Sequence, residues 1–194
     1  TYGFINAKLK TRISLILPQS FYDQLIRAAD LDAALALVRE TTFREAAAAY
    51  ERTGDLRMAE LELFGREVEL HLELERYLSA QVLAFAQAMA ARYEVEALKA
   101  SLRVWFDRAI RGRDTAEAGG CLYRGRVHHD LEVDRILAAA DVEALLAALA
   151  GSPYAAVVAP HADAIAAGSL FEAEIALDRA FFEQLLAAAA GLPR

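Results

Sequence analysis

The chain carries two copies of one helical pattern, and this repeat constrains its fold more than any other feature. Residues 29–38 (ADLDAALALV) return as residues 140–149 (ADVEALLAAL). The similarity continues from residues 41–43 (TTF) to residues 152–154 (SPY), at the same offset of 111 residues. A unit of this length is longer than a tetratricopeptide or armadillo repeat. We therefore expect two copies of a small helical module, which is an arrangement more typical of a scaffold than of a catalyst.

A second pair of matching segments lies upstream of each copy. Residues 2–12 (YGFINAKLKTR) match residues 93–103 (YEVEALKASLR) at an offset of 91 residues. The second copy has therefore gained about 20 residues between its two matching segments. We place the first module at residues 1–92 and the second at residues 93–194.

Composition favours an all-α fold. The chain is 56% hydrophobic with only 10 glycines and 4 prolines, and its abundant alanine and leucine are the residues that a helix holds at the lowest cost. No segment shows the period of two that a strand requires. Short polar residues before apolar runs predict helix N-caps at Ser20, Asp30, Thr41 or Thr42, Asp55 and Ser169. The expected helices span residues 2–17, 21–29, 31–40, 43–52, 55–92, 93–110, 130–140, 142–150, 154–167 and 170–190.

Charge and length exclude several functional classes. The net charge of −7 argues against nucleic acid as the main partner, because phosphate binding needs a basic surface. No apolar run approaches the roughly 20 residues of a membrane span, and no signal-peptide pattern is present. A single cysteine, Cys121, rules out an internal disulfide and fits a reducing compartment. Residues 103–126 carry a local net charge of +3, which predicts either a solvated loop or a surface that attracts an acidic partner or lipid headgroups.

Motifs for catalysis and metal binding are missing. A di-iron bundle needs Glu-x-x-His, and no histidine of this chain has a glutamate three residues before it. The densest group of potential ligands is His128-His129-Asp130, which indicates either part of a zinc site or, as we prefer, a helix N-terminus capped by Asp130. No phosphate-binding glycine loop and no nucleophile elbow occur. We expect no catalytic residue, no cofactor and no metal.

Several segments resemble one family when they are taken in order, the C/d family of V/A-type ATPase subunits (C in archaea and bacteria, d in eukaryotes). Residues 2–12 are similar to the Tyr-x-Tyr-Leu-Asn-Ala-Arg-x-Arg that opens members of this family. Residues 35–43 resemble its Leu-x-x-Leu-x-x-Thr-x-Tyr, residues 94–103 its Asp-x-x-Asn-Leu-x-x-Leu-x-Arg, and residues 170–185 its Leu-Glu-x-x-Leu-Asp-Arg-x-Tyr-x-x-x-Leu. The chain departs from the pattern at three positions, Phe43, Ala97 and Phe181.

The resemblance implies a fold of helical modules with long helices around a pseudo-threefold axis, of which this chain holds two modules, an incomplete funnel. It also implies a non-catalytic central-stalk subunit that couples the rotor stalk to the membrane ring during ATP-driven ion transport or ATP synthesis. The implied location is cytoplasmic and peripheral, at the cytoplasmic face of the membrane, with membrane contact only through the complex. A generic helical scaffold for protein–protein interaction, not tied to a membrane, is the alternative.

By motif position, the resemblance implies a set of polar residues near the axis that receives the stalk. These partner-binding candidates are Asn6, Arg12, Glu96, Lys99 and Arg103. Salt bridges within one helix or between the two modules explain the same residues equally well. The open flank of two modules also allows the chain to form an oligomer.

Overall fold

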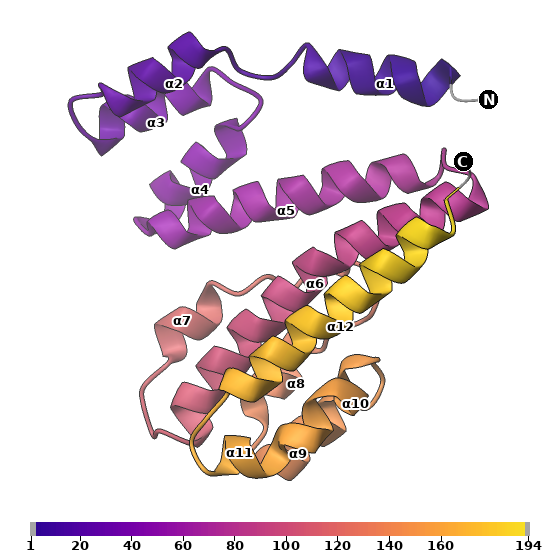
Figure 1. Cartoon of the computed structure of the whole chain (residues 1–194). Helices are drawn as coiled ribbons and strands as arrows, with labels where there is room; N and C mark the ends of the chain where they lie inside the picture. Colours follow the sequence, from indigo (N-terminus) through magenta and orange to yellow (C-terminus); the bar gives the residue numbers. More distant parts are fainter. Residues whose placement is uncertain (1–2, 193–194) are drawn as a thin grey trace. The chain divides into compact units, whose positions relative to one another are not determined.

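The computed structural model describes residues 3–192, and in that range the protein is all-α, with no strand. The all-α prediction is confirmed, whereas the pseudo-threefold axis stays a prediction. Figure 1 labels the helices along the chain. They are α1 (Gly3–Ile13), α2 (Gln19–Ile26), α3 (Leu31–Arg39), α4 (Arg44–Thr53), α5 (Leu56–Glu75), α6 (Ala80–Ala109), α7 (Ala116–Gly120), α8 (Val133–Ala138), α9 (Val142–Leu149), α10 (Tyr154–Val158), the 3₁₀ turn η1 (Ala159–His161), α11 (Ala162–Ala166) and α12 (Phe171–Ala190).

The chain divides into two compact units. Unit 1 holds the residues up to Glu67 together with Arg76–Leu78, and unit 2 holds Val68–Glu75 and the chain from Ser79 onward. The predicted module boundary between residues 92 and 93 falls within α6. Because that boundary comes from the sequence repeat and not from contacts, it stays a prediction.

One expected helix boundary is wrong. A single helix over residues 55–92 and another over 93–110 were expected, but the break lies between α5 and α6, with Ser79 in extended conformation at the α6 N-cap. No glycine or proline marks this break. In unit 1 the Tyr77 ring lies 4.8 Å from the Phe4 ring, whereas the residues on both sides of Arg76–Leu78 belong to unit 2. We attribute the break to these tertiary contacts, which the sequence does not show.

The repeat is visible in the hydrogen bonds of the two copies. Asp30 caps α3 by accepting a bond from the Ala33 backbone N–H at 2.8 Å, and Asp141 caps α9 by accepting from Ala144 at 2.9 Å. At the other end of each helix, a hydroxyl donates to the carbonyl three residues earlier. Thr41 donates to Val38 at 2.6 Å, and Ser152 donates to Leu149 at 2.9 Å. All four bonds keep the offset of 111 residues, so the sequence repeat corresponds to a repeat in local structure.

The equivalent caps at Asp30 and Asp141 allow the same substitution to be compared in both copies of the repeat. We expect Asp30→Ala and Asp141→Ala each to lower the free energy of unfolding by about 1 kcal/mol, because each change leaves a helix N–H without its acceptor. Asn keeps the acceptor oxygen, so Asp141→Asn is the control and should cost far less. Urea titrations of the variants measure the differences. Two alanine variants as stable as the parent would show that the caps contribute nothing.

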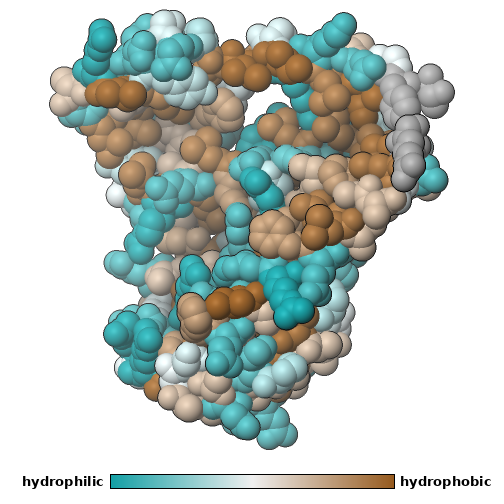
Figure 2. Space-filling view, viewed as in Figure 1, coloured by the Kyte–Doolittle hydropathy of each residue, from teal (hydrophilic) through white to brown (hydrophobic). Residues whose placement is uncertain are grey.

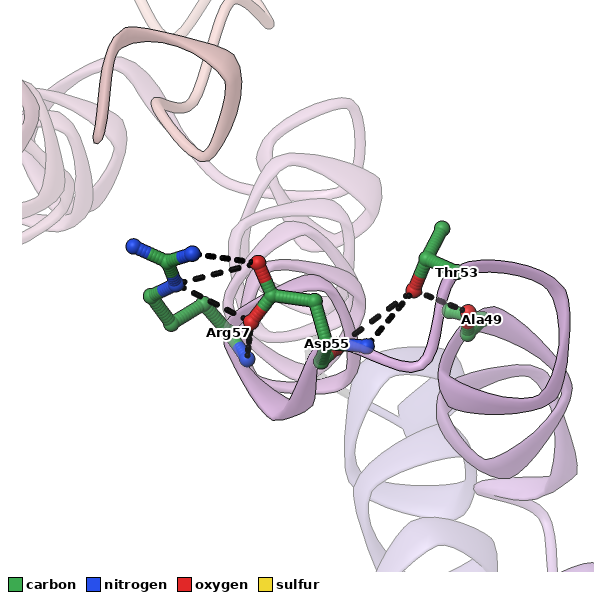
Figure 3. Close-up of polar contacts among 4 residues, drawn as sticks. All are labelled: Ala49, Thr53, Asp55 and Arg57. Carbon is green, nitrogen blue, oxygen red and sulfur yellow. Dashed lines mark hydrogen bonds and ion pairs between the residues drawn. The ribbon is translucent and has the colours of Figure 1, made fainter. Parts of the chain in front are cut away.

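The turn between α4 and α5 is fixed by local bonds (Figure 3). Gly54 has a φ of +68°, in the left-handed region that favours glycine. The Thr53 hydroxyl donates to the Ala49 carbonyl at 2.8 Å. Asp55 accepts from the Arg57 backbone N–H at 2.9 Å and also pairs with the Arg57 guanidinium at 2.7 Å. The predicted cap at Asp55 is therefore confirmed.

Unit 1 packs small residues closely. Its helix α4 buries Ala46, Ala47 and Ala49, and α3 buries Leu35. Helix α3 contacts both α2 and α4. Alanine has no side chain beyond Cβ, so the helix backbones can approach closely.

Unit 2 has the larger core. Helices α6 and α12 lie side by side along most of their length (Figure 1), and α8, α9, α10 and α11 pack around them at one end. Trp105 is fully buried, and its indole Nε1 donates to the Ala139 carbonyl at 2.9 Å. The other large core residues come from α6 and from every later helix except α7; they are Val95, Leu98, Leu102, Phe106, Ile136, Leu145, Leu149, Tyr154, Val158, Ile165 and Leu177.

Four predicted caps are wrong. Asp130 does not cap a helix, because α8 begins only at Val133 with Glu132 at its N-cap. Ser169 does not cap α12, whose N-cap is Leu170 with no side-chain bond. Ser20 lies inside α2, which begins at Gln19, and neither Thr41 nor Thr42 is the N-cap of α4, which is Phe43. Residues 111–127, where no helix was expected, contain the short helix α7. Tyr2, where the first predicted helix begins, lies outside the described residues.

Candidate functional site

Three of the five partner-binding candidates lie along one helix of unit 2, where α6 meets α12. Lys99 donates to both Asp178 carboxylate oxygens, at 2.8 and 2.7 Å. One turn further along α6, Arg103 forms a two-pronged pair with Glu174, with Nε 2.5 Å from Oε1 and Nη2 2.9 Å from Oε2. Lys99 comes four residues before Arg103 on α6, whereas its partner Asp178 comes four residues after Glu174 on α12. The two helices are therefore antiparallel, and two adjacent ion pairs join them.

Burial separates the two pairs. The Lys99 side chain is only 17% exposed, whereas the Arg103 side chain is 59% exposed. The pKa of Arg103 is raised, chiefly by its hydrogen bond to Glu174 and also by the negative charges of Glu174 and Asp178. Solvent-exposed pairs of this kind contribute at most about 1 kcal/mol. Lys99 and Arg103 thus form ion pairs between two helices of unit 2, not within one helix or between the predicted modules. Their role in partner binding stays a prediction.

Glu96 behaves differently from its neighbours. Its side chain is exposed, and it makes no hydrogen bond or ion pair with any residue in the described range 3–192. It borders a recess of about 400 Å³ between α6 and α12, whose walls are mostly apolar. The recess is lined by Met89, Arg92, Val95, Glu96, Asp178, Phe181, Phe182 and Leu185. A carboxylate on the rim of an apolar recess is suited to a partner that offers a cation beside an apolar side chain.

The remaining two candidates lie on α1, in unit 1. Asn6 is exposed and Arg12 is half-buried. By the offset of 91 residues, Arg12 corresponds to Arg103 and Lys8 corresponds to Lys99. The structure thus places two candidates in unit 1 and three in unit 2.

A buried carboxylate that the sequence did not single out organises the other side of α6. Glu94 is 1% exposed, and its Oε2 accepts from the backbone N–H groups of His128 and His129 at 2.9 and 3.0 Å. Its Oε1 lies 2.6 Å from Nδ1 of the His129 ring. Glu94 therefore anchors the segment between α7 and α8 to α6.

Other polar groups surround this anchor. His128 Nε2 lies 3.6 Å from Glu75 Oε1, and the Tyr93 hydroxyl lies 3.2 Å from His71 Nδ1. Burial, followed by the charge of Glu94, raises the pKa of Tyr154 above its ordinary value. His128 and His129 thus have a structural role, because both residues hydrogen-bond to the Glu94 carboxylate. In the described part of the chain no three potential ligands are grouped closely enough to hold a metal ion.

The arginine-rich segment at residues 103–126 is largely paired within unit 2. Arg111 and Arg113 both contact Asp107, at 3.0 and 3.2 Å, and lower the pKa of that carboxyl. Arg124 contacts Asp134 at 2.9 Å. These internal pairs reduce the free positive charge that the composition had indicated.

The sequence analysis missed Asp178 and Glu174, although the sequence contains a pattern that could have indicated them. These two acidic residues are four positions apart, as Lys99 and Arg103 are, which is the spacing that two ion pairs between neighbouring helices require. Glu94 offered no signal, because its two backbone donors lie 34 and 35 residues away.

The comparisons with known proteins give a clear family match. The family model described as ATP synthase (C/AC39) subunit matches residues 5–193. No curated protein and no solved structure matches the chain. Within residues 3–192, no helix is both long enough and apolar enough to cross a membrane.

Proposed function

The chain belongs to the ATP synthase (C/AC39) subunit family, and we propose that it is a non-catalytic central-stalk subunit of a rotary V/A-type ATPase. In this role it couples the rotor stalk to the membrane ring during ATP-driven ion transport or ATP synthesis. Its partners are the central-stalk subunits and the ring, and it lies at the cytoplasmic face of the membrane. The observation that supports the proposal most is the family match over nearly the whole chain.

The helical architecture supports the same role. A subunit that transmits torque needs rigid elements, and α6 and α12 run side by side for most of the 30 residues of α6. The contact between these two helices is stabilised by two ion pairs and by the buried core around Trp105. Two long helices that are packed together and joined by ion pairs resist bending better than a single helix does.

Glu96 is the residue best suited to test partner binding. Reversing the charge of Lys99 or Arg103 would break the ion pair with Asp178 or Glu174. A loss of stalk binding in such a variant could therefore come from a lost contact with the stalk or from a less stable fold. Glu96 has no such internal role. We propose that Glu96 in unit 2 contacts the stalk. Asn6 and Arg12 in unit 1 are separate candidates for such a contact.

We expect Glu96→Arg to weaken binding to purified central-stalk subunits by about tenfold or more, because a favourable charge pair is replaced by repulsion. Isothermal titration calorimetry measures the affinity. Glu143→Arg, an equally exposed glutamate on α9, is the matched control and should bind as the parent does. Equal affinity of all three proteins would remove Glu96 from the interface, and no binding by the parent would contradict the proposed role.

A further inference from the structure

Two buried polar atoms of unit 2 face each other without a hydrogen bond. His128 Nε2 lies 3.6 Å from Glu75 Oε1, and the two side chains are only 18% and 19% exposed. Among residues 3–192, neither of these two atoms has a hydrogen-bond partner, although both are buried. Such atoms are rare in folded proteins, because a buried polar group without a partner lowers stability. We call these two residues the junction pair.

The junction pair lies where α5 ends. Only the last part of α5, Val68–Glu75, belongs to unit 2, and the three residues that follow belong to unit 1. Glu75 provides two of the contacts that hold this part of α5 to unit 2. Its Oε2 accepts a hydrogen bond from Gln87 on α6 at 3.2 Å, and its Oε1 faces His128. A change at the junction pair therefore acts where the chain passes between the two units.

The charge of the imidazole decides whether the two members of the junction pair attract each other. At 3.6 Å the two atoms are too far apart for a hydrogen bond, but opposite charges still attract over this distance. A neutral His128 leaves the buried Glu75 carboxylate without a cation, whereas a protonated His128 neutralises it. An imidazole changes its charge between about pH 5 and pH 8. The attraction is therefore present at the acidic end of this range and is lost as the pH rises.

The other charged groups around His128 do not cancel this effect. On α6, the Glu94 carboxylate accepts from the His128 backbone N–H at 2.9 Å. Next to His128 in the chain, Arg126 donates to the His128 carbonyl at 3.3 Å, and His129 pairs with Glu94. With both histidines neutral, the two carboxylates and one guanidinium leave this site with an excess of negative charge. A proton on His128 reduces that excess.

Two other histidine–glutamate contacts differ from the junction pair. His129 Nδ1 lies 2.6 Å from Glu94 Oε1, where even a neutral imidazole can donate a hydrogen bond. His161 Nδ1 lies 3.6 Å from Glu172 Oε2, but the Glu172 side chain is 67% exposed. Figure 2 shows hydrophilic side chains spread over the surface, where water screens such pairs. Among these three contacts, the junction pair alone combines burial with a separation too long for a hydrogen bond.

We propose that the junction pair is a protonation-sensitive latch, which holds the end of α5 to unit 2 while His128 is charged and loosens it when His128 is neutral. As the pH rises, Val68–Glu75 is then the part of unit 2 that opens first. The latch thus makes the connection between the two units respond to pH. This inference does not depend on the proposed rotary function.

Amide hydrogen exchange of the whole chain tests the latch. Exchange rates are measured at about pH 5.5 and pH 8 and divided by the rates of an unstructured peptide at the same pH, so that only the change in protection remains. We expect the protection of Val68–Glu75 to fall at least about fivefold at pH 8, the smallest effect expected when a buried polar group loses its partner. The amides of Leu98–Phe106, in the core part of α6, should keep their protection.

Three variants connect this change to the junction pair. His128→Gln and Glu75→Gln should each remove the pH dependence, because neither protein can form the ion pair. His161→Gln is the matched control, because it removes a histidine at the same 3.6 Å from an exposed glutamate, and it should keep the pH dependence of the parent. Circular dichroism at both pH values checks that each variant folds. In the parent, the nuclear magnetic resonance signals of the His128 ring should titrate over the same pH range in which the protection falls.

Several results would overturn the latch. A parent with equal protection of Val68–Glu75 at both pH values has no such device. A His128→Gln protein that keeps the pH dependence while His129→Gln loses it would assign the effect to the contact with Glu94. An equal loss of protection throughout α6 at pH 8 would show a change in global stability. None of these results bears on binding to the central stalk, so the proposed rotary function would stand.

Discussion

Replacing Trp105 with alanine is expected to lower the free energy of unfolding by about 3–5 kcal/mol, the range measured for large aromatic residues in cores. Trp105 is fully buried and belongs to the core cluster that α6 forms with α8, α9, α10, α11 and α12. The change removes most of the side chain from the centre of unit 2 and leaves a cavity that the surrounding helices can fill only in part.

Trp105→Phe separates packing from hydrogen bonding. Phenylalanine keeps an aromatic ring but loses the bond from Nε1 to the Ala139 carbonyl. That carbonyl still accepts a bond from Arg108, so it is not left without a donor. We expect this variant to cost about 1–2 kcal/mol.

Guanidinium denaturation followed by circular dichroism measures both effects. Tryptophan fluorescence is unsuitable, because Trp105 is the only tryptophan of the chain. Ile26→Ala, at an exposed position, is the control and should change stability by less than about 0.5 kcal/mol. A Trp105→Ala protein as stable as this control would show that the core of unit 2 is not packed as described.

The second large effect is expected at Glu94. We expect Glu94→Ala to lower the free energy of unfolding by about 3 kcal/mol or more, because the backbone N–H groups of His128 and His129 lose their acceptor in a buried site. Glu94→Gln keeps one acceptor oxygen and should lose roughly half as much. Both effects depend on the burial of Glu94, which is 1% exposed.

Two measurements distinguish an anchor from a passive buried residue. Urea unfolding gives the change in stability, and amide hydrogen exchange reports on the backbone N–H groups of His128 and His129. We expect these two amides to lose protection in Glu94→Ala even under conditions where α6 stays protected. Glu96→Gln, two residues away on the same helix but exposed, is the matched control. Unchanged exchange at both amides in Glu94→Ala would refute the anchor.

The helical capping residues show where sequence-based reasoning succeeds. Asp30 and Asp55 each accept a bond from a backbone N–H two or three residues later. Such a bond needs only the local chain, so the short-range pattern predicts it. The pattern alone is not sufficient, because the predicted caps at Ser20, at Thr41 or Thr42, at Asp130 and at Ser169 are not formed where α2, α4, α8 and α12 begin.

The charged residues show where it fails. The motif position of Lys99 and Arg103 indicated either partner binding or salt bridging, and nothing local decided between them. Their carboxylate partners are 79 and 71 residues away, and only the packing of α12 against α6 brings these groups together. Glu96 has the same kind of motif support, but the structure leaves it exposed on the rim of a recess.

Composition and short-range pattern were enough to predict the all-α class, the two copies of the repeat and the helix caps at Asp30 and Asp55, because these features depend on residue type and on bonds within about one turn. The resemblance found in the motifs also indicated the family that the comparison shows. Only the folded chain shows the break at Arg76–Leu78, the burial of Glu94 and the ion pairs between α6 and α12. Each of these features depends on groups that lie far apart in the chain. The energies of these contacts depend on burial, which the sequence pattern does not show.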